Sequence, residues 1–436
     1  MDLELLAHTL GARLVGSRRT IEGLSIDSRT LRPGQLFAAV RGERDGHDFV
    51  ADAVAAGAGA CLVERVDAEA LSGTPALVVD SVSDALAALA RLARDRIEAT
   101  AAGRVVGVTG SVGKTTTKDL LASVLRQQYL TAASEKSFNN ELGVPLTLAN
   151  APDDVEALVV EMGARGDGHI RTLCDLARPS VAVVTLVAAV HSEFMGGLDR
   201  IAATKGELVE SLPAGGVAVL NADDERVAAM ASHTASRVLT FGDGGDVRAE
   251  DVRLDAELRA TFTLRTPDGS IPVHLGVRGE HNVTNALAAA AAAWALGVDI
   301  DGTAAGLAAP ELSPWRMELV RPASGAVLLN DSYNANPTSM TAALRALAEV
   351  DATRRVAVLG YMAELDDAVA EHRRVAEVAD QLGIEVVAFA TDLYGVDPVE
   401  GIDAAVSALG SLGPGDAVLI KASRSVGLER LVAAIS

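Results

Sequence analysis

The sequence predicts an α/β protein of three domains, with a parallel sheet and a phosphate-binding loop in the central domain. Two observations carry this prediction. Short runs of β-branched and aliphatic residues alternate with longer helical patterns along most of the 436 residues. At residues 107–117, a glycine-rich turn with a lysine followed by threonines connects a predicted strand to a predicted helix.

The expected domains are residues 1–100, 101–313 and 314–436, and the length allows this number. A helix is expected at 82–97, before a segment of linker composition at 99–103. The last domain repeats strand–helix alternation and is expected to be Rossmann-like. The strands are expected at 36–40, 60–63 and 76–79, at 104–109, 157–161 and 181–185, and at 327–330, 355–359, 385–389 and 417–421.

Residues 246–278 have a different pattern. Apolar and polar residues alternate there, and Pro267-Asp268-Gly269 has the composition of a turn. This predicts an antiparallel hairpin appended to the central sheet. The alanine-rich run 286–298 is too short to span a membrane and is expected to be a core helix.

The composition excludes several classes of protein. A formal net charge of -21 argues against a nucleic-acid-binding protein, because sequence-independent binding needs a basic surface. The start of the chain lacks the pattern of a signal peptide, and no run predicts a membrane span. Cys61 and Cys174 are expected to be buried free thiols of a reducing compartment. We therefore expect a cytoplasmic protein, working as a monomer, that holds anionic substrates through local positive groups.

Residues 107–117 form a candidate site for a nucleotide triphosphate. Backbone N–H groups and a helix N-terminus would face one anion, while Lys114 adds positive charge and Thr115 holds Mg²⁺. The strict pattern of such a loop requires glycine where Val108 stands. The alternative, an ordinary turn with a surface lysine, is disfavoured because strand, turn and helix follow in the required order.

Three polar residues are expected near this loop. Glu161 ends a strand that should lie beside it, and His191 follows the next strand at the same sheet edge. Lys205 lies on the following helix. Each residue also has a non-functional interpretation: Glu161 as a polar residue at a strand end, His191 as a structural histidine, and Lys205 as a solvated lysine on a helix.

Two later segments are rich in amides. Asn282 is a candidate helix cap, and Asn282 with Asn285 could instead bind a purine edge. Residues 331–337 carry more polar groups, Tyr333 among them, than a turn needs.

Together these motifs resemble the Mur ligases. The resemblance runs from about residue 26 to 424, and within the family the runs 137–148, 333–337 and 362–365 favour the branch that joins D-alanyl-D-alanine to UDP-N-acetylmuramoyl-tripeptide. Its main motifs are Thr-Gly-Ser-Val-Gly-Lys-Thr-Thr at 109–116, Glu-Met-Gly-Ala at 161–164, His191 with Lys-Gly-Glu at 205–207, Gly-Glu-His-Asn-Val-Thr-Asn at 279–285 and Asp-Ser-Tyr-Asn-Ala-Asn-Pro at 331–337.

The resemblance implies an ATP-dependent ligase of peptidoglycan precursor synthesis. In this chemistry a carboxylate attacks the γ-phosphate of ATP to give an acyl phosphate and ADP, and an amine then displaces phosphate. Lys114, Glu161, His191 and Lys205 would be catalytic, with Mg²⁺ on Thr115 and, at a second site, on Glu161 and His191. Lys205 would be carbamylated and would ligate or support Mg²⁺. The nucleotide would contact Thr109, Gly110, Ser111, Gly113, Lys114, Thr115, Thr116, Asn282, Asn285, Arg316 and Asp331.

The resemblance also implies substrate contacts. Loops in the first domain would hold the UDP end of one substrate, residues 139 and 140 its peptide, and residues 333 and 334 the incoming dipeptide. These residues are Ser28, Arg29, Asp45, His47, Asn139, Asn140, Tyr333 and Asn334.

Four positions depart from the usual family pattern. Arg165, Leu186, Tyr361 and Ala422 stand where the family usually has Asn, Asn, Asp and Gly. These changes leave the ATP motifs intact and fall in regions that could face the peptide or the incoming amine. The alternative that the chain is a family member joining a different carboxylate and amine therefore stays open. A relative of folylpolyglutamate synthetases is disfavoured by the first domain, which that branch lacks. A regulatory protein that only holds or hydrolyses ATP would not need the motifs at 281 and 331.

Overall fold

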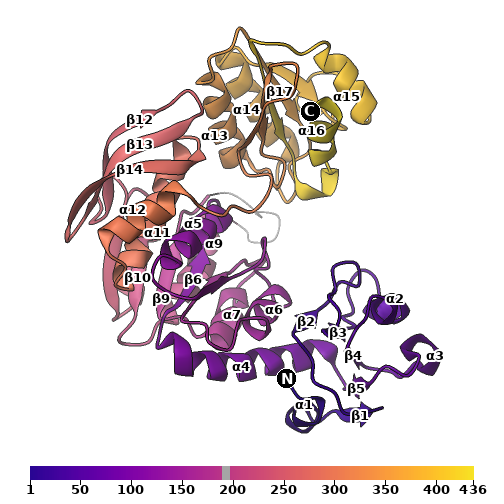
Figure 1. The fold of residues 1–436 in the computed structure, drawn as a ribbon. Helices are drawn as coiled ribbons and strands as arrows, with labels where there is room; N and C mark the ends of the chain where they lie inside the picture. Colours follow the sequence, from indigo (N-terminus) through magenta and orange to yellow (C-terminus); the bar gives the residue numbers. More distant parts are fainter. Residues whose placement is uncertain (189–196) are drawn as a thin grey trace.

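The computed structural model describes residues 1–188 and 197–436, which form three α/β units (Figure 1). The N-terminal unit contains strands β1 to β5, the central unit β6 to β14, and the C-terminal unit β15 to β19. The central unit adjoins both of the others (Figure 1). The predicted α/β class is confirmed.

The N-terminal unit is built on a five-stranded sheet of order β1-β5-β4-β3-β2. All its neighbours are parallel except β1 and β5. Its elements are α1 (Leu3–Leu10), β1 (Arg13–Val15), β2 (Leu24–Ser25), β3 (Leu36–Ala38), α2 (Val50–Ala55), β4 (Ala60–Val63), α3 (Ala68–Leu71), β5 (Ala76–Val78) and α4 (Val82–Ala101).

Helix α4 corrects the expected linker. The helix begins at an N-cap, Ser81, and continues to Ala101, through most of the segment predicted to be a loop. Its first half packs in the core of the N-terminal unit through Leu86, and its second half packs in the central core through Ile97. The small residues at 99–103, which end in glycine, suggested a loop, but burial of the apolar face keeps the chain helical to Ala101. One rigid helix therefore joins two cores.

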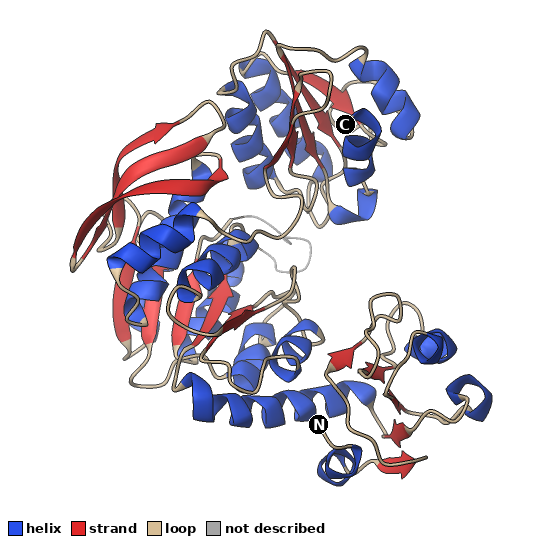
Figure 2. Ribbon diagram, viewed as in Figure 1, coloured by secondary structure: helices blue, strands red, loops and turns tan. Residues whose placement is uncertain are grey.

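The central sheet has six parallel strands in the order β11-β10-β9-β6-β8-β7. Alternate residues of each strand enter different cores: Val105 packs with α4, α6, α7 and α9, whereas Val106 packs with α5 and α11. Helices thus cover both faces (Figure 2). The elements are β6 (Val105–Thr109), α5 (Lys114–Leu125), β7 (Thr131–Ala133), α6 (Gly143–Ala149), β8 (Ala157–Glu161), α7 (His169–Ala177), β9 (Val181–Val184), α9 (Leu198–Glu210), β10 (Val217–Asn221), α10 (Glu225–Ala229) and β11 (Arg237–Phe241).

The expected hairpin at 246–278 is a separate sheet of three antiparallel strands. These are β12 (Arg248–Leu254), β13 (Arg259–Thr266) and β14 (Gly269–Arg278), and the predicted turn joins the last two. The alternating stretch at 252–254 lies in the first strand, which pairs with β13 through a register shift and so extends the expected hairpin to three strands. Helix α11 (His281–Ala295) buries its alanines, which confirms the expected core helix, and α12 (Ile300–Ala308) follows.

The C-terminal unit has a five-stranded sheet of order β15-β16-β19-β17-β18, in which only β15 is antiparallel to its neighbour. Helices α13 and α14 pack in one core, and α15 and α16 in the other. Within the described ranges, no helix combines the length and apolar character needed to cross a bilayer. The elements are β15 (Glu318–Val320), β16 (Val327–Asn330), α13 (Pro337–Ala348), β17 (Arg354–Leu359), α14 (Ala368–Gln381), β18 (Glu385–Ala388), α15 (Ile402–Leu409), β19 (Asp416–Lys421) and α16 (Glu429–Ile435).

The role of α4 in the central core can be tested with one substitution. Ile97→Ala removes a side chain that is 1% exposed and should lower the free energy of unfolding. The expected loss is about 2–5 kcal/mol, the usual cost of such a cavity. Urea unfolding followed by circular dichroism measures it. Leu92→Ala, at a position on the same helix that is 39% exposed, is the control. Equal losses in the two variants would contradict the assignment.

Candidate functional site

A cavity of about 850 Å³ lies between the central and C-terminal units. Its walls come from the carboxyl ends of parallel strands, where loops of an α/β sheet usually bind ligands. It brings together these predicted residues: Ser111, Gly113, Lys114, Thr115, Thr116, Asn139, Asn140, Glu161, Lys205, Asn282, Asn285, Arg316, Asp331, Tyr333 and Asn334. Thr109 ends β6 and Gly110 begins the loop after it, but neither lines the cavity. His191 lies outside the described residues.

The loop between β6 and α5 has the geometry of a phosphate cradle. Gly113, the N-cap of α5, has a φ of 87°, and a Cβ there would lie 2.2 Å from Asn285 Oδ1. Only glycine therefore fits between this helix and α11. Lys114 Nζ donates to the carbonyls of Gly110 and Ser111 at 2.7 and 3.3 Å. Its ammonium is thus held over the loop, beside the N-terminus of a helix that favours anions.

The segment after β9 supports this loop. Thr185 Oγ1 donates to the Val112 carbonyl at 2.6 Å, and the Ser111 N–H donates to the Leu186 carbonyl at 2.8 Å. The Ser111 hydroxyl also exchanges hydrogen bonds with the backbone of Ala188 at 2.9 Å. The loop is therefore fixed from the neighbouring strand, mostly through backbone groups.

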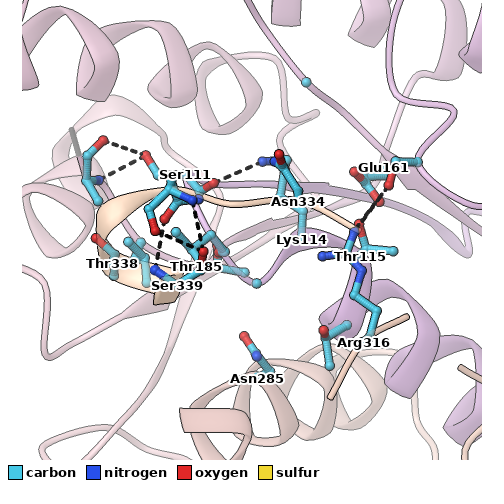
Figure 3. Close-up of a pocket in the computed structure, with 18 of the residues that line it drawn as sticks. Ser111, Lys114, Thr115, Glu161, Thr185, Asn285, Arg316, Asn334, Thr338 and Ser339 are labelled. Carbon is cyan, nitrogen blue, oxygen red and sulfur yellow. Dashed lines mark hydrogen bonds between the residues drawn. The ribbon is translucent and has the colours of Figure 1, made fainter. Parts of the chain in front are cut away.

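Oxygen atoms gather at one end of the cavity, where Figure 3 shows Lys114, Thr115, Glu161 and Arg316 together. The Thr115 and Ser137 hydroxyls are 3.1 Å apart. Glu161 is 1% exposed; its Oε1 accepts from Asn139 Nδ2 at 2.7 Å, while Oε2 has no hydrogen-bond partner among the described residues. A buried carboxylate oxygen without a partner is costly and indicates an absent ligand.

Arg316 reaches this end of the cavity from the start of the C-terminal unit. Its Nη2 donates to Thr115 Oγ1 at 2.9 Å, and its guanidinium lies 4.3 Å from the centre of the Tyr333 ring. Both of its neighbours have positive φ, 60° at Trp315 and 48° at Met317. Such backbone persists only where the surroundings impose it, which is common at functional sites.

Lys205 is a buried cation. Its side chain lies on α9, is 3% exposed as a residue, and has no hydrogen-bond or ion-pair partner among the described residues. Burial, together with the charge of Lys114, lowers the pKa of Lys205 to about 7. Close to neutral pH a large fraction of this amine is therefore uncharged.

A buried ion pair faces the loop from the C-terminal unit. Lys421, at the end of β19, donates to Asp331 Oδ2 at 2.5 Å and to the Asn334 carbonyl at 2.8 Å. Burial lowers the pKa of Lys421, although Asp331 opposes this shift. The Asn336 side chain forms a capping box with Ser339 at the start of α13. Part of the polar run at 331–337 therefore shapes the backbone.

The two asparagines of α11 bind each other. Asn285 Nδ2 donates to Asn282 Oδ1 at 2.7 Å, and Asn282 Nδ2 donates to the Arg278 carbonyl at 2.6 Å. Asn282 is not the helix cap, because the N-cap is Glu280 and makes no side-chain cap bond. Both side chains line the cavity, so their contact with a purine stays a prediction.

The four predicted contacts in the N-terminal unit do not line this cavity. Ser28 and Arg29 follow β2, and Arg29 pairs with Asp27 at 2.6 Å. His47 Nδ1 lies 2.6 Å from Asp45 Oδ1, and its Nε2 accepts from the Glu64 N–H at 2.9 Å. These contacts orient the loop, and substrate binding there stays a prediction.

Several residues that line the cavity were not predicted as site residues, among them Ser137, Glu364 and Lys421. Ser137 was used only as part of a motif, yet its hydroxyl is beside Thr115. A lysine at the carboxyl end of a parallel strand was the available signal for Lys421. Glu364 belongs to the run 362–365, which was used only to place the chain within the family, and its position in the cavity depends on how the units pack.

Three family profiles match nearly the whole chain: Mur ligase family, catalytic domain at 20–95, Mur ligase middle domain at 108–293, and Mur ligase, glutamate ligase domain at 315–424. A UDP-N-acetylmuramoyl-tripeptide–D-alanyl-D-alanine ligase of Mycobacterium tuberculosis is 41% identical over 96% of this chain and 92% of its own length. The chain belongs to the Mur ligase family.

Solved structures agree with this assignment. MurF from Acinetobacter baumannii superposes with a TM-score of 0.83 at 31% identity, over 99% of this chain and 98% of that one. MurF ligase from Thermotoga maritima, solved in complex with ADP, has a TM-score of 0.78 at 31% identity over 95% and 97% of the two chains.

The four departures in this Mur ligase have different environments. Leu186 lines the cavity, and its carbonyl accepts from the Ser111 N–H of the phosphate-binding loop. Ala422 is fully buried near Gly360, and the Tyr361 ring stacks on His372 with centroids 5.3 Å apart. Arg165 lines the cavity.

The glycine cradle gives a direct test. Gly113→Ala should weaken binding of Mg²⁺ and a non-hydrolysable ATP analogue about tenfold or more, because the left-handed backbone alone costs about 1–2 kcal/mol with a Cβ present. Calorimetric titration measures the affinity. Gly215→Ala is the matched control, since nothing lies within 4 Å of a Cβ there. Unchanged affinity in Gly113→Ala would contradict the cradle.

Proposed function

We propose that this Mur ligase uses ATP to join D-alanyl-D-alanine to UDP-N-acetylmuramoyl-tripeptide, a step of peptidoglycan precursor synthesis. The observation that carries the proposal is the shared cavity, where Lys114, Thr115 and Glu161 of the central unit meet Arg316 of the C-terminal unit. Full-length similarity to ligases with this substrate pair supports the choice of substrates.

The first step is attack of the tripeptide carboxylate on the γ-phosphate, with ADP as leaving group. Such a transfer depends on positioning and on stabilising negative charge rather than on covalent help. Lys114 and the N-terminus of α5 lie where the phosphates would bind. Arg316 is within reach of the same loop. The acyl phosphate is then open to attack by the amine, and phosphate leaves as the amide bond forms.

The residues at one end of the cavity fit Mg²⁺, a hard cation that prefers oxygen ligands. The Thr115 and Ser137 hydroxyls and the unpartnered Glu161 Oε2 would hold it. When bound, the ion would neutralise charge on the phosphates. Arg316 would then exchange its hydrogen bond to Thr115 for the nucleotide. His191 stays a predicted ligand outside the described residues.

Lys205 is proposed to be carbamylated. A buried ammonium without a partner is unfavourable, and its pKa of about 7 makes the neutral amine available to react with CO₂. The product is an anion, which could ligate or support Mg²⁺ where an ammonium would repel it.

In the proposed arrangement, each of the three units binds a different ligand. Residues 1–100 would bind the UDP end through Ser28, Arg29, Asp45 and His47, and Asn139 with Asn140 would face the peptide. Residues 101–313 would bind ATP, and residues 314–436 would receive the dipeptide near Tyr333 and Asn334. We also propose that the enzyme acts as a monomer. We place the reaction in the cytoplasm.

The decisive experiment is ADP release with ATP and Mg²⁺ and each substrate alone or both together. Turnover that requires both substrates is expected. Lys114→Ala should reduce it by about 10³-fold or more, since the variant loses charge stabilisation of the transferring phosphate. No turnover with both substrates, but turnover with another carboxylate and amine, would overturn the substrate assignment and keep the ligase chemistry.

Removal of the Lys205 amine tests the carbamate. Lys205→Ala should lose most activity and regain part of it with added short carboxylates that occupy the vacated space. In wild type, CO₂-depleted buffer should lower activity more strongly below pH 7 than above it, because protonation of the amine removes the reactive form. Steady-state rates at several pH values and bicarbonate concentrations measure this. Normal turnover of Lys205→Ala would refute the modification.

A further inference from the structure

Two side chains of opposite charge face each other across the cavity from different units. Arg165 follows β8 of the central unit, and Glu364 follows β17 of the C-terminal unit. Arg165 Nη2 lies 3.9 Å from Glu364 Oε1, which is an ion pair without a direct hydrogen bond. The Arg165 side chain is 72% exposed and the Glu364 side chain 31%. The arginine can therefore move at little cost, whereas the carboxylate is more confined.

The backbone around Glu364 is held in place. Glu364 has a φ of 64°, a left-handed conformation that a residue with a side chain adopts only under constraint. The preceding N–H groups are both bonded, that of Met362 to His372 Nε2 and that of Ala363 to Ser423 Oγ, each at 2.9 Å. Met362 itself is fully buried. The structure thus presents this carboxylate from a fixed loop, as binding sites require.

The carboxylate is close to the reaction centre. Its charge raises the pKa of Lys114, against the larger effect of burial. Among the described residues, the C-terminal unit contributes two acids to the cavity wall, Asp331 and Glu364, and Asp331 is bonded to Lys421. An anionic tripeptide would be repelled by Glu364, whereas an amino group would be attracted.

We propose that Glu364 and Arg165 bind the incoming dipeptide as a zwitterion, with Glu364 on its amino group and Arg165 on its terminal carboxylate. The inference rests on the proposed function and deepens it. A dipeptide spans at most about 7 Å, so side chains from opposite walls can reach its two ends once the exposed arginine turns outward. Arg165 stands where the family usually has asparagine, so the second contact would be particular to chains with arginine at this position.

The test compares Glu364→Gln and Arg165→Ala with wild type in the full reaction, with separate KM values for all three substrates. Glu364→Gln should raise the KM for D-alanyl-D-alanine about tenfold or more, the usual effect of losing one charge-assisted hydrogen bond. The KM values for ATP and for UDP-N-acetylmuramoyl-tripeptide should not change. Hydroxylamine, a small nucleophile that needs no such site, should still trap the acyl phosphate at the wild-type rate.

Arg165→Ala should raise the KM for the dipeptide. It should also abolish the preference of the enzyme for D-alanyl-D-alanine over D-alanyl-D-alanine amide, which lacks the terminal carboxylate. Two ion-paired residues outside the cavity supply matched controls, Glu385→Gln and Arg171→Ala. Neither should change any KM.

Three results would overturn parts of this assignment. If Arg165→Ala raised the KM of the tripeptide substrate instead, the arginine contact would be refuted. An unchanged dipeptide KM in Glu364→Gln, with wild type turning over normally, would overturn the carboxylate contact alone. No ADP release by wild type with both substrates would overturn the proposed function together with this inference.

Discussion

Lysines whose charged form is disfavoured by burial, placed around the phosphate-binding loop, are the constraint on which this Mur ligase site depends. Lys205 and Lys421 are buried, and Lys114 lies beside a helix N-terminus. Desolvation lowers the pKa of all three. Only Lys421 has a carboxylate in direct contact, Asp331, among the described residues. A polyanionic nucleotide bound against the N-terminus of α5 would favour the charged form of Lys114, which burial disfavours.

The same site ties the C-terminal unit to the phosphate-binding loop. Arg316 donates to Thr115, and the Ser313 N–H donates to Asp119 Oδ2 at 2.7 Å, so the connecting segment is attached to α5 at two points. Asp119 is in turn paired with Lys118 at 2.6 Å. Exchange of the Arg316 bond for a nucleotide would therefore act on the position of the whole C-terminal unit.

The sequence predicted the regular parts of the molecule well, because strand composition and the glycine turn are local signals. The helix predicted after the glycine turn is α5, and Glu161 is at the end of its strand as expected. The predictions that failed concern features that depend on packing between distant parts of the chain. The linker at 99–103 is mostly helix because two cores bury its neighbours. Asn139 was expected to face the peptide, yet its amide also holds Glu161, a pairing that no spacing in the sequence reveals.

The departures from the family pattern bear differently on substrate choice. Leu186 lines the cavity as an uncharged residue, and its carbonyl accepts a hydrogen bond from the phosphate-binding loop. Ala422 is inside the C-terminal core, and Tyr361 packs against His372 outside the cavity lining. Arg165 alone among the four presents a new charge to the cavity. Any difference in specificity from other family members should therefore be sought first where this guanidinium faces Glu364, since a charged group changes ligand preference more than a buried apolar one.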